Sequence, residues 1–297
     1  MKTKFLALSV FILLFIKSEI IFSQTTLSQA VAEKENVLES EFQKLIAAQT
    51  DQEKKEANTE ILKTFNEMLK LQESFTHKFT KLKNVGILTS ADQEVRIYTW
   101  NLFWQDGTFD YYGFIQHKND KKGIDLIQLF DDSKNIENPE KQVLTNKNWF
   151  GALYYEIIDV KDKERTYYTL LAWDGNDLFS NKKLVDVLYF SNVGQAKFGH
   201  PIFRRKGRLA KRVVFEYSKT ASMALTYDPK LQAIVFDRLV PSKPTFEGNF
   251  KFYVTDVTTD GLVLSKDKVW DFVEDVQSMN AENKGLKNRK TEKQIKQ

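Results

Sequence analysis

Cysteine is absent from the chain of 297 residues. A protein without cysteine has no disulfides, so its folded state must be held together by its core. The same absence excludes thiolate zinc sites, iron–sulfur clusters and cysteine nucleophiles. It also excludes the N-terminal acylation of a bacterial lipoprotein, which takes place on a cysteine.

Histidine is scarce, with three residues: His77, His117 and His200. No HxH, HExxH or HxxxH spacing occurs, so we expect no metal site and no cofactor. No G-x-S-x-G motif is present to place a serine nucleophile beside a histidine. The sequence shows no recognisable catalytic motif, which favours a protein that is not an enzyme.

Long apolar runs are missing beyond the first residues. Phe5–Ile16 is a run of twelve residues, apolar except for Ser9, behind Lys2 and Lys4, and it is shorter than the roughly 20 residues that span a bilayer. This pattern predicts a secretory signal peptide over residues 1–23, cleaved after Ser23. We therefore expect an exported protein, periplasmic or at the outer surface, with no transmembrane span in the mature chain.

The charge of +4 is concentrated at the two ends of the chain. Residues 1–23 carry three Lys against one Glu, and residues 276–297 carry six Lys or Arg against two Glu, which leaves −2 for residues 24–275. A nucleic-acid-binding protein would carry its basic excess on the fold, so we expect no nucleic-acid partner. Residues 276–297 have few apolar side chains and are predicted to be a disordered basic tail.

A helical hairpin is predicted over residues 24–84. Gly and Pro are absent from residue 26 to residue 82, and good helix formers predominate. An apolar stripe with a 4-3 spacing runs from Ile61 through Phe65, Phe75 and Phe79 to Leu82. The polar stretch "QTDQEKKEANTE" before it is either a break or a solvated bridge. Three Phe on one stripe favour burial over a coiled-coil seam, and an oligomer through these helices is the alternative.

An antiparallel β domain is predicted over residues 85–275. The segments between turn signals alternate and are rich in Tyr, Phe, Trp, Val and Ile. Asp106-Gly107 predicts a type I′ hairpin turn, Lys206-Gly207 a hairpin tip, and "TTDG" at the end of "DVTTDG" a further hairpin turn. The connections are short and no helices alternate with the strands, so we expect an α+β protein whose β domain is a curved sheet, sandwich or partly open barrel.

Several segments together resemble a group of exported Bacteroidota-type proteins of unknown function. These segments are "SADQEVRIYTWNLFWQDGTFDYYGFIQH", "YYTLLAWDGNDLFSNKKLVDVLYF", "FGHPIF", "RVVFEYSKTASMALTYD" and "IVFDRLVP". The resemblance implies export and a shared β-rich fold. It carries no activity and no site residues.

The polar insert "WDGND" between two apolar runs is the first place to look for a site. Asp174 and Asp177 beside Trp173 are candidates for a carboxylate pair, although both lie at turn signals, where Asp is also expected for backbone reasons. We interpret the insert as a strand, a short helical elbow over residues 177–182 capped by Asp177, and a second strand. His200 in "FGHPIF" is a turn histidine or a ligand-lining residue.

Aromatic residues crowd the first half of the β region, and Trp100 and Tyr112 are the candidates there to line a ligand. The basic run "RRKGRLAKR" (residues 204–212) is interpreted as a solvated hairpin, with an anionic surface such as lipopolysaccharide as the alternative ligand. The best functional hypothesis is a non-enzymatic, exported envelope protein that binds another envelope protein or a glycan. The alternatives are a hydrolase with carboxylates near Trp173–Asp177 and a helix-mediated assembly partner.

Overall fold

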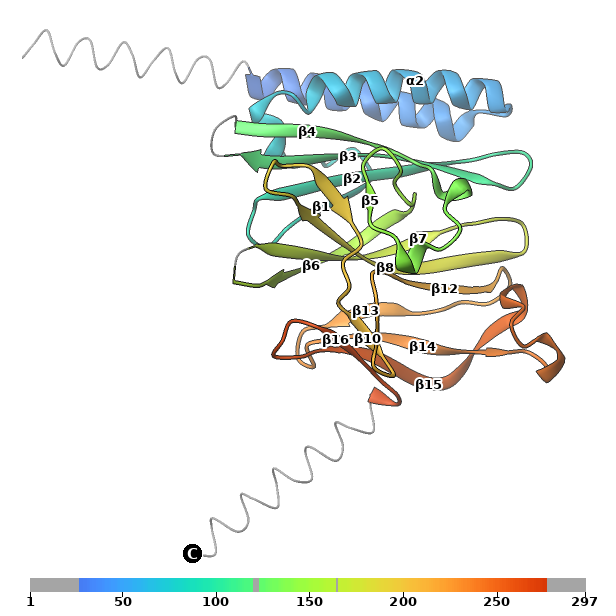
Figure 1. Cartoon of the computed structure of the whole chain (residues 1–297). Coiled ribbons are helices and arrows are strands. Elements are labelled where there is room, and N and C mark those ends of the chain that lie inside the picture. Colours follow the sequence, from blue (N-terminus) through green and yellow to red (C-terminus); the bar gives the residue numbers. More distant parts are fainter. Residues whose placement is uncertain (1–26, 120–122, 164, 277–297) are drawn as a thin grey trace, which may run out of the picture. The chain divides into compact units, whose positions relative to one another are not determined.

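The computed structural model describes residues 27–119, 123–163 and 165–276. The predicted signal peptide and residues 277–297 of the predicted tail lie outside these ranges. Two helices precede a large, mainly antiparallel β region in three sheets (Figure 1), which confirms the α+β class. The chain divides into two compact units, residues 1–85 with 116–126 and residues 86–115 with 127–297. Among the described helices, none is long and apolar enough to cross a membrane.

The first unit contains the predicted helical hairpin. The first helix covers residues 27–47 of the described chain, and the second is α2, Asp51–Met68. A capping box begins α2: the Thr50 hydroxyl accepts a hydrogen bond from the Glu53 N–H, and the Glu53 carboxylate accepts one from the Thr50 N–H at 2.9 Å. The break between the helices is therefore confined to residues 48–50, and most of the polar stretch is helical.

Helix α2 ends earlier than predicted, so the prediction of one helix through to Leu82 is wrong. After Met68 the chain turns into the 3-10 helix η1, Gln72–Phe75. The Gln116 amide donates to the Leu69 carbonyl and to the Ser74 hydroxyl, each at 2.8 Å. The first contact satisfies a backbone carbonyl that a longer helix would pair internally. Phe65 and Phe75 are still buried, at 0% and 4% exposed, and are not available to a partner.

The first sheet has the order β1-β2-β3-β4. Its strands are β1 Gly86–Thr89, β2 Val95–Phe103, β3 Phe109–Asn119 and β4 Gly123–Phe130. A hairpin turn joins β2 to β3 at Asp106-Gly107 as predicted, but its type differs. Only Gly107 has a positive φ, of 84°, and the Trp104 N–H donates to the Thr108 carbonyl. This is a three-residue loop with glycine in the left-handed position.

The middle sheet has the order β5-β9-β8-β7-β6, and β12 pairs with β8. Its strands are β5 Leu144–Thr145, β6 Leu153–Lys161, β7 Thr166–Asp174, β8 Ser180–Phe190, β9 Ala196–Phe198 and β12 Val213–Ser218. The 3-10 helices η2, Ser133–Asn135, and η3, Pro139–Lys141, connect β4 to β5. All described pairings in this sheet are antiparallel.

The last sheet has the order β11-β10-β16-β15-β14-β13. Its strands are β10 Phe203–Arg205, β11 Arg208–Ala210, β13 Leu225–Asp228, β14 Ala233–Pro241, β15 Tyr253–Leu264 and β16 Trp270–Val273. The β10–β16 pair is parallel. Between β14 and β15 lie the 3-10 helices η4, Pro244–Phe246, and η5, Phe250–Phe252.

Of two turns predicted in the last sheet, one is confirmed and the other is wrong. Lys206-Gly207 is the tip of the β10–β11 hairpin, with both φ values positive at 49° and 75°, as a two-residue I′ loop requires. The turn predicted at "TTDG" is wrong, because β15 continues through it. Asp237 of β14 pairs with Thr259 of β15, whereas Leu239 pairs with Thr255. The extra residues of β15 between these two pairs form a bulge.

The middle sheet is buried on both faces within the second unit. Leu170 and Leu184 face a core shared with the first sheet, whereas Leu171 and Val185 face a core shared with the last sheet. Neighbouring residues of a strand point to opposite faces, so a strand buried on both faces needs a continuous apolar run. "LLA" in β7 and "LV" with "VL" in β8 provide such runs.

Asp186 is a charged residue within the buried run of β8, and it forms an ion pair with Arg212. Asp186 and Arg212 are both 0% exposed, and the Arg212 Nε lies 2.8 Å from the Asp186 Oδ2. The Arg212 Nη1 also donates to the Pro139 carbonyl at 2.6 Å, and the guanidinium lies 5.9 Å from the Phe150 ring centre. The ion pair thus joins β8, the start of β12 and η3.

Breaking this pair should destabilise the fold strongly. Asp186→Asn leaves the Arg212 guanidinium buried without a counter-charge, so we expect the free energy of unfolding to fall by about 3–5 kcal/mol. Urea denaturation followed by tryptophan fluorescence measures the change. The double variant Asp186→Leu/Arg212→Met removes both charges and should lose less stability than Asp186→Asn. A loss below about 1 kcal/mol in Asp186→Asn would show that the pair is not structural.

Candidate functional site

The six residues predicted to line a site lie in three separate places. Trp173, Asp174 and Asp177 are in or beside the β7–β8 turn, and Trp100 and Tyr112 are on β2 and β3. His200 follows β9. The β7–β8 turn contacts β3 through Tyr111 and Phe109, and each of the three places has local packing or backbone partners.

The β7–β8 turn is built around a buried carboxylate. Asp174 is 5% exposed, and its Oδ1 accepts hydrogen bonds from the Tyr111 hydroxyl at 2.9 Å and from the Asn176 N–H at 2.7 Å. The Tyr111 hydroxyl in turn accepts the Gly175 N–H at 2.7 Å. Burial raises the pKa of Asp174, opposed by the Asn176 N–H and the charge of Lys182. The network holds the backbone of the turn.

Asp177 also accepts hydrogen bonds from the backbone of the turn. Its Oδ1 accepts hydrogen bonds from the N–H groups of Phe179 at 2.7 Å and Ser180 at 2.9 Å. The helical elbow predicted over residues 177–182 is wrong: β8 already begins at Ser180. The signal was misread because an Asx turn uses the same aspartate-to-backbone hydrogen bonds as a helix N-cap. Trp173 is half-buried against the edge of the Phe109 ring.

The remaining predicted residues are packed against aromatic neighbours. His200 stacks on Tyr167 with ring centres 4.5 Å apart, and burial lowers its pKa, as does the charge of Arg165. Trp100 is 0% exposed and stacks on Tyr112 at 5.9 Å. Burial raises the pKa of Tyr112 to about 12. These contacts are sufficient to explain the positions of the rings by packing.

A groove runs along the outer edge of β12. This strand pairs with β8, and no further described strand pairs with its other edge. Val213 and Phe215 point to the core shared with the last sheet, but both are only half-buried. β12 has six residues and is the edge strand on this side of the middle sheet. The core between the two sheets is therefore open along this edge.

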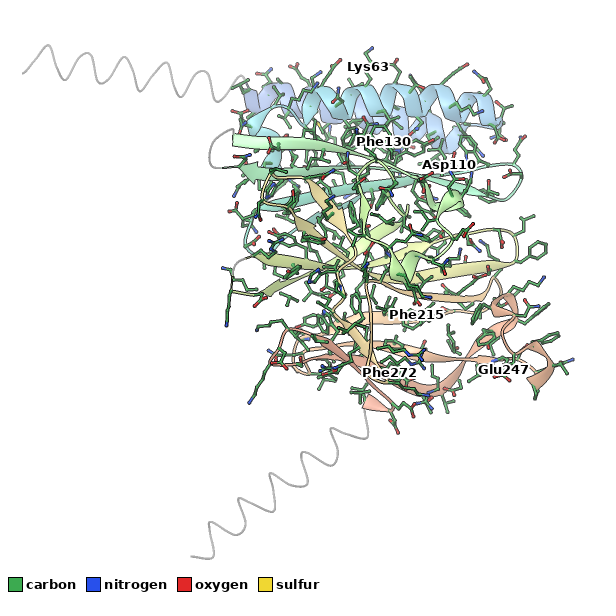
Figure 2. The ribbon with its side chains drawn as sticks, viewed as in Figure 1. Lys63, Asp110, Phe130, Phe215, Glu247 and Phe272 are labelled. Atoms are coloured by element: carbon green, nitrogen blue, oxygen red, sulfur yellow. The ribbon has the colours of Figure 1, made fainter. Side chains whose placement is uncertain are left out.

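The apolar part of the groove is a cavity of about 650 Å³, a size typical of small-molecule sites. Phe215 of β12, Phe236 of β14 and Phe272 of β16 form its aromatic floor, with ring centres 4.6 Å apart for Phe215 and Phe236 and 6.2 Å apart for Phe236 and Phe272. Figure 2 labels Phe215 and Phe272, which come from the middle sheet and the last sheet. Leu262 of β15 also lines the floor.

Basic side chains of the β10–β11 hairpin line the same cavity. The Arg205 guanidinium lies 4.3 Å from the Phe272 ring centre, and Lys206 and Arg208 lie at or beside the hairpin tip. Arg204 is neutralised by Asp271, with contacts of 2.5 and 2.9 Å that raise the pKa of the guanidinium. In contrast, Arg205, Lys206 and Arg208 form no ion pair with any carboxylate that the structure describes.

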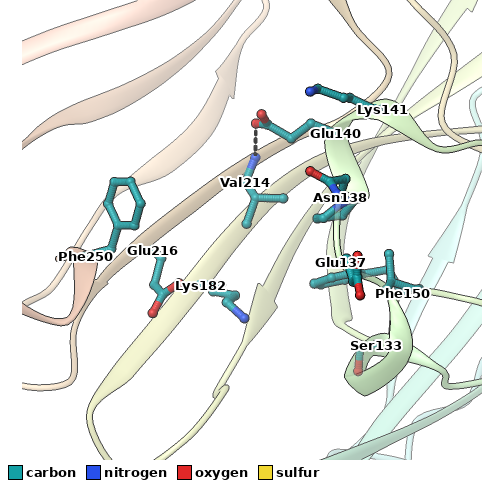
Figure 3. Close-up of a pocket in the computed structure, with 12 residues that line it drawn as sticks. Ser133, Glu137, Asn138, Glu140, Lys141, Phe150, Lys182, Val214, Glu216 and Phe250 are labelled. Carbon is teal, nitrogen blue, oxygen red and sulfur yellow. Dashed lines mark hydrogen bonds between the residues drawn. The ribbon is translucent and has the colours of Figure 1, made fainter. Parts of the chain in front are cut away.

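The other end of the groove is polar and is held by η3. A cavity of about 440 Å³ there is lined by Glu137, Glu140, Lys182, Glu216 and Phe250, among others. Figure 3 shows Phe250 on one side of this cavity and Glu137 on the other, with Glu216 and Lys182 between them. The Glu140 carboxylate accepts the Val214 N–H at 3.2 Å. This contact caps the outer edge of β12 near the middle of the groove.

The two cavities belong to one groove because a third, of about 350 Å³, shares lining residues with both. It shares Phe215 and Phe272 with the apolar end, and Glu216 and Phe250 with the polar end. The described residues contain no group of three or more His, Asp or Glu that could hold a metal ion. The arrangement is that of a binding groove with an apolar, cationic end and a mixed-charge end.

Comparisons with protein-family models, with curated proteins and with solved structures give no match to this chain. The resemblance to exported proteins of unknown function is not tested by them.

The groove was only partly visible in the sequence. The basic run at residues 204–212 marked the hairpin, but its charges were interpreted as a solvated surface. The aromatic floor comes from three strands that are far apart in the chain, at Phe215, Phe236 and Phe272. Nothing in their local patterns distinguishes them from ordinary core residues.

Because Asp174 is buried and its pKa is raised, we expect the free energy of unfolding to depend on pH. A carboxyl group whose pKa is raised on folding favours folding in its protonated form, so its stabilising effect is present at low pH and is lost as pH rises through the folded-state pKa. The asparagine side chain of Asp174→Asn would keep an oxygen acceptor for Tyr111 and would carry no charge. We therefore expect the stability of Asp174→Asn relative to wild type to increase as pH rises from about 4 to 7. Urea unfolding at several pH values measures it, and an opposite slope would contradict the raised pKa.

Proposed function

We propose that the protein is a non-enzymatic binding protein whose groove along β12 takes an anionic amphiphile, a molecule with an apolar chain and a phosphate or carboxylate head group. The observation that carries the proposal is the placement of Arg205, Lys206 and Arg208 beside the aromatic floor of one cavity. The predicted export would place such a protein in the cell envelope, where acylated, anionic lipids are abundant.

The apolar end of the groove supports the chain of such a ligand. Phe215 and Phe272 are half-buried and line the cavity. Covering apolar surface contributes about 25 cal/mol per Å² removed from water, so a chain laid over these rings gains affinity from the floor. A sugar ligand would instead need several polar groups along the floor, and the side chains there are Val, Phe and Leu.

The basic hairpin supports the head group. Arg205 is fixed over Phe272 by a cation–π contact, which leaves its N–H donors available to a phosphate or carboxylate. Arg204 and Arg238 are engaged with Asp271 and Asp260, so they do not compete for the ligand. At the apolar end of the groove, Arg205, Lys206 and Arg208 therefore remain without a described carboxylate partner beside the neutralised Arg204.

The alternative function is a carboxylate hydrolase, and the described contacts do not favour it. Asp174 and Asp177 accept hydrogen bonds from turn backbone groups, and Asp174 is buried. A general acid and a base must both reach the substrate.

The proposed function is tested with three detergents that share a dodecyl chain, each below its critical micelle concentration. We expect saturable binding of dodecyl phosphate, weaker binding of dodecyl maltoside and no binding of dodecyltrimethylammonium, measured by calorimetry. Laurate in place of dodecyl phosphate distinguishes a carboxylate from a phosphate head group. Equal affinity for the anionic and cationic detergents would contradict a site that selects anions.

The same assay tests the basic hairpin. Arg205→Ala/Arg208→Ala should weaken dodecyl phosphate binding about tenfold, or about 1.4 kcal/mol, because charge-assisted contacts to the head group are lost. The control Lys163→Ala/Lys230→Ala removes the same net charge from exposed positions outside the groove and should bind as wild type does. Equal weakening in both variants would mean that only the overall charge matters.

A further inference from the structure

Exposed apolar side chains gather on three connections at one end of the second unit. The connections are the β2–β3 turn, the β7–β8 turn and the segment between β14 and β15, which lie on the right of Figure 1. We call the exposed residues the loop-tip rim; with their exposed fractions they are Phe103 49%, Leu178 60%, Phe179 63%, Phe250 49% and Phe252 37%.

The rim is one continuous surface. A Cβ atom on Gly107 would lie 2.2 Å from the Leu178 Cδ2, so the Leu178 side chain rests on the β2–β3 turn. The Lys251 Nζ lies 5.6 Å from the Phe179 ring centre and 5.5 Å from that of Phe252. The β7–β8 turn therefore touches both of the other connections.

The rim differs from isolated exposed apolar residues elsewhere in the same unit. Val193 and Val257 are 89% and 102% exposed and stand singly, which is ordinary for a protein surface. Contiguous exposed apolar side chains instead mark an interaction site. Internal hydrogen bonds fix the turns that carry the rim. The Asp106 carboxylate accepts one from the Thr108 N–H, and the Asp177 carboxylate accepts one from the Ser180 N–H. The backbone therefore holds these side chains outward.

One lysine lies beside the apolar side chains of the rim, and a second lies beside the neighbouring Phe109 ring. Lys251 lies over the Phe179 and Phe252 rings, and Lys219 lies over the Phe109 ring at 5.1 Å. Lys219 also donates to the Gly175 carbonyl at 2.8 Å, but neither lysine forms an ion pair with a described carboxylate. Lys251 therefore keeps a positive charge with no described carboxylate in contact, whereas the charge of Lys219 is partly offset by Asp177 and Asp174 nearby.

The charged groups around the rim suit a lipid surface. Asp106 and Asp177, the acidic residues of the two turns, stay charged but turn their carboxylates toward the N–H groups of their own turns, whereas Lys251 lies over the exposed rings. Cations beside large apolar side chains are typical of segments that lie in a membrane interface.

We propose that the loop-tip rim inserts into the surface of a phospholipid bilayer, with Leu178 and Phe179 entering the acyl region and Lys251 contacting lipid phosphates. A stable protein interface buries about 1,200–2,000 Å² and includes about ten hydrogen bonds. The rim offers a few apolar tips and one cation, which fits shallow insertion better.

The position of the rim also connects it to the groove. Phe250 lines the polar and central cavities of the groove, and with Phe179 and Lys251 it also lines a hollow of about 390 Å³ at the rim. A bilayer at the rim would therefore meet the open end of the groove. The insertion does not depend on the identity of the groove's ligand, so it goes beyond the proposed function.

Flotation of the folded chain with vesicles of phosphatidylethanolamine and phosphatidylglycerol tests the insertion. We expect wild type to float with the vesicles and Leu178→Ser/Phe179→Ser to partition about tenfold more weakly, since the inserted apolar groups are lost. The control Val193→Ser/Val257→Ser removes two exposed apolar side chains outside the rim and should float as wild type does.

Two further readouts make each outcome decisive. Circular dichroism melts should be the same for all variants, because every substituted side chain is exposed. Arg205→Ala/Arg208→Ala should still float, and Leu178→Ser/Phe179→Ser should still bind dodecyl phosphate, so a failure of the rim and a failure of the groove are separable. Failure of wild type to float, or flotation of the rim variant at the wild-type level, overturns the proposal.

Discussion

The buried ion pair of Asp186 and Arg212 is the constraint on which the arrangement around the groove depends. A charged pair with no solvent exposure is tolerated only when both partners are held in place. Arg212 meets this condition by also donating to the Pro139 carbonyl, and η3 then places Glu140 against the Val214 N–H. The ion pair therefore fixes both the start of β12 and the segment that closes part of its edge.

The groove lies where the middle sheet ends, at the unpaired edge of β12. The middle sheet is covered on both faces over β7 and β8, but β12 has six residues whereas β15 opposite has twelve. Aromatic side chains that would be fully buried under a further strand remain accessible beside the β10–β11 hairpin. η5 packs beside β12, so Phe250 lies where the groove meets the loop-tip rim. A binding surface can thus arise from incomplete coverage of a core.

The features that could be predicted from the sequence are those with local signals. The helical hairpin, the antiparallel strands and the hairpin tip at Lys206-Gly207 all depend on periodicity or on φ > 0. The long helix to Leu82 was mispredicted because its end depends on Gln116, a residue distant in the chain. The groove could not be predicted because Phe215, Phe236 and Phe272 meet only through the pairing of strands in two different sheets.

The most direct test of the groove is methyl NMR of the chain titrated with dodecyl phosphate. The account predicts that the methyl signals of Val213, Leu262 and Ala210, which line the apolar cavity, shift together and saturate at one ligand per chain. Val193 and Val257, which lie outside it, should not move. Shifts confined to other methyl groups, or no saturable shift, would contradict the central claim that the open edge of β12 is a ligand site.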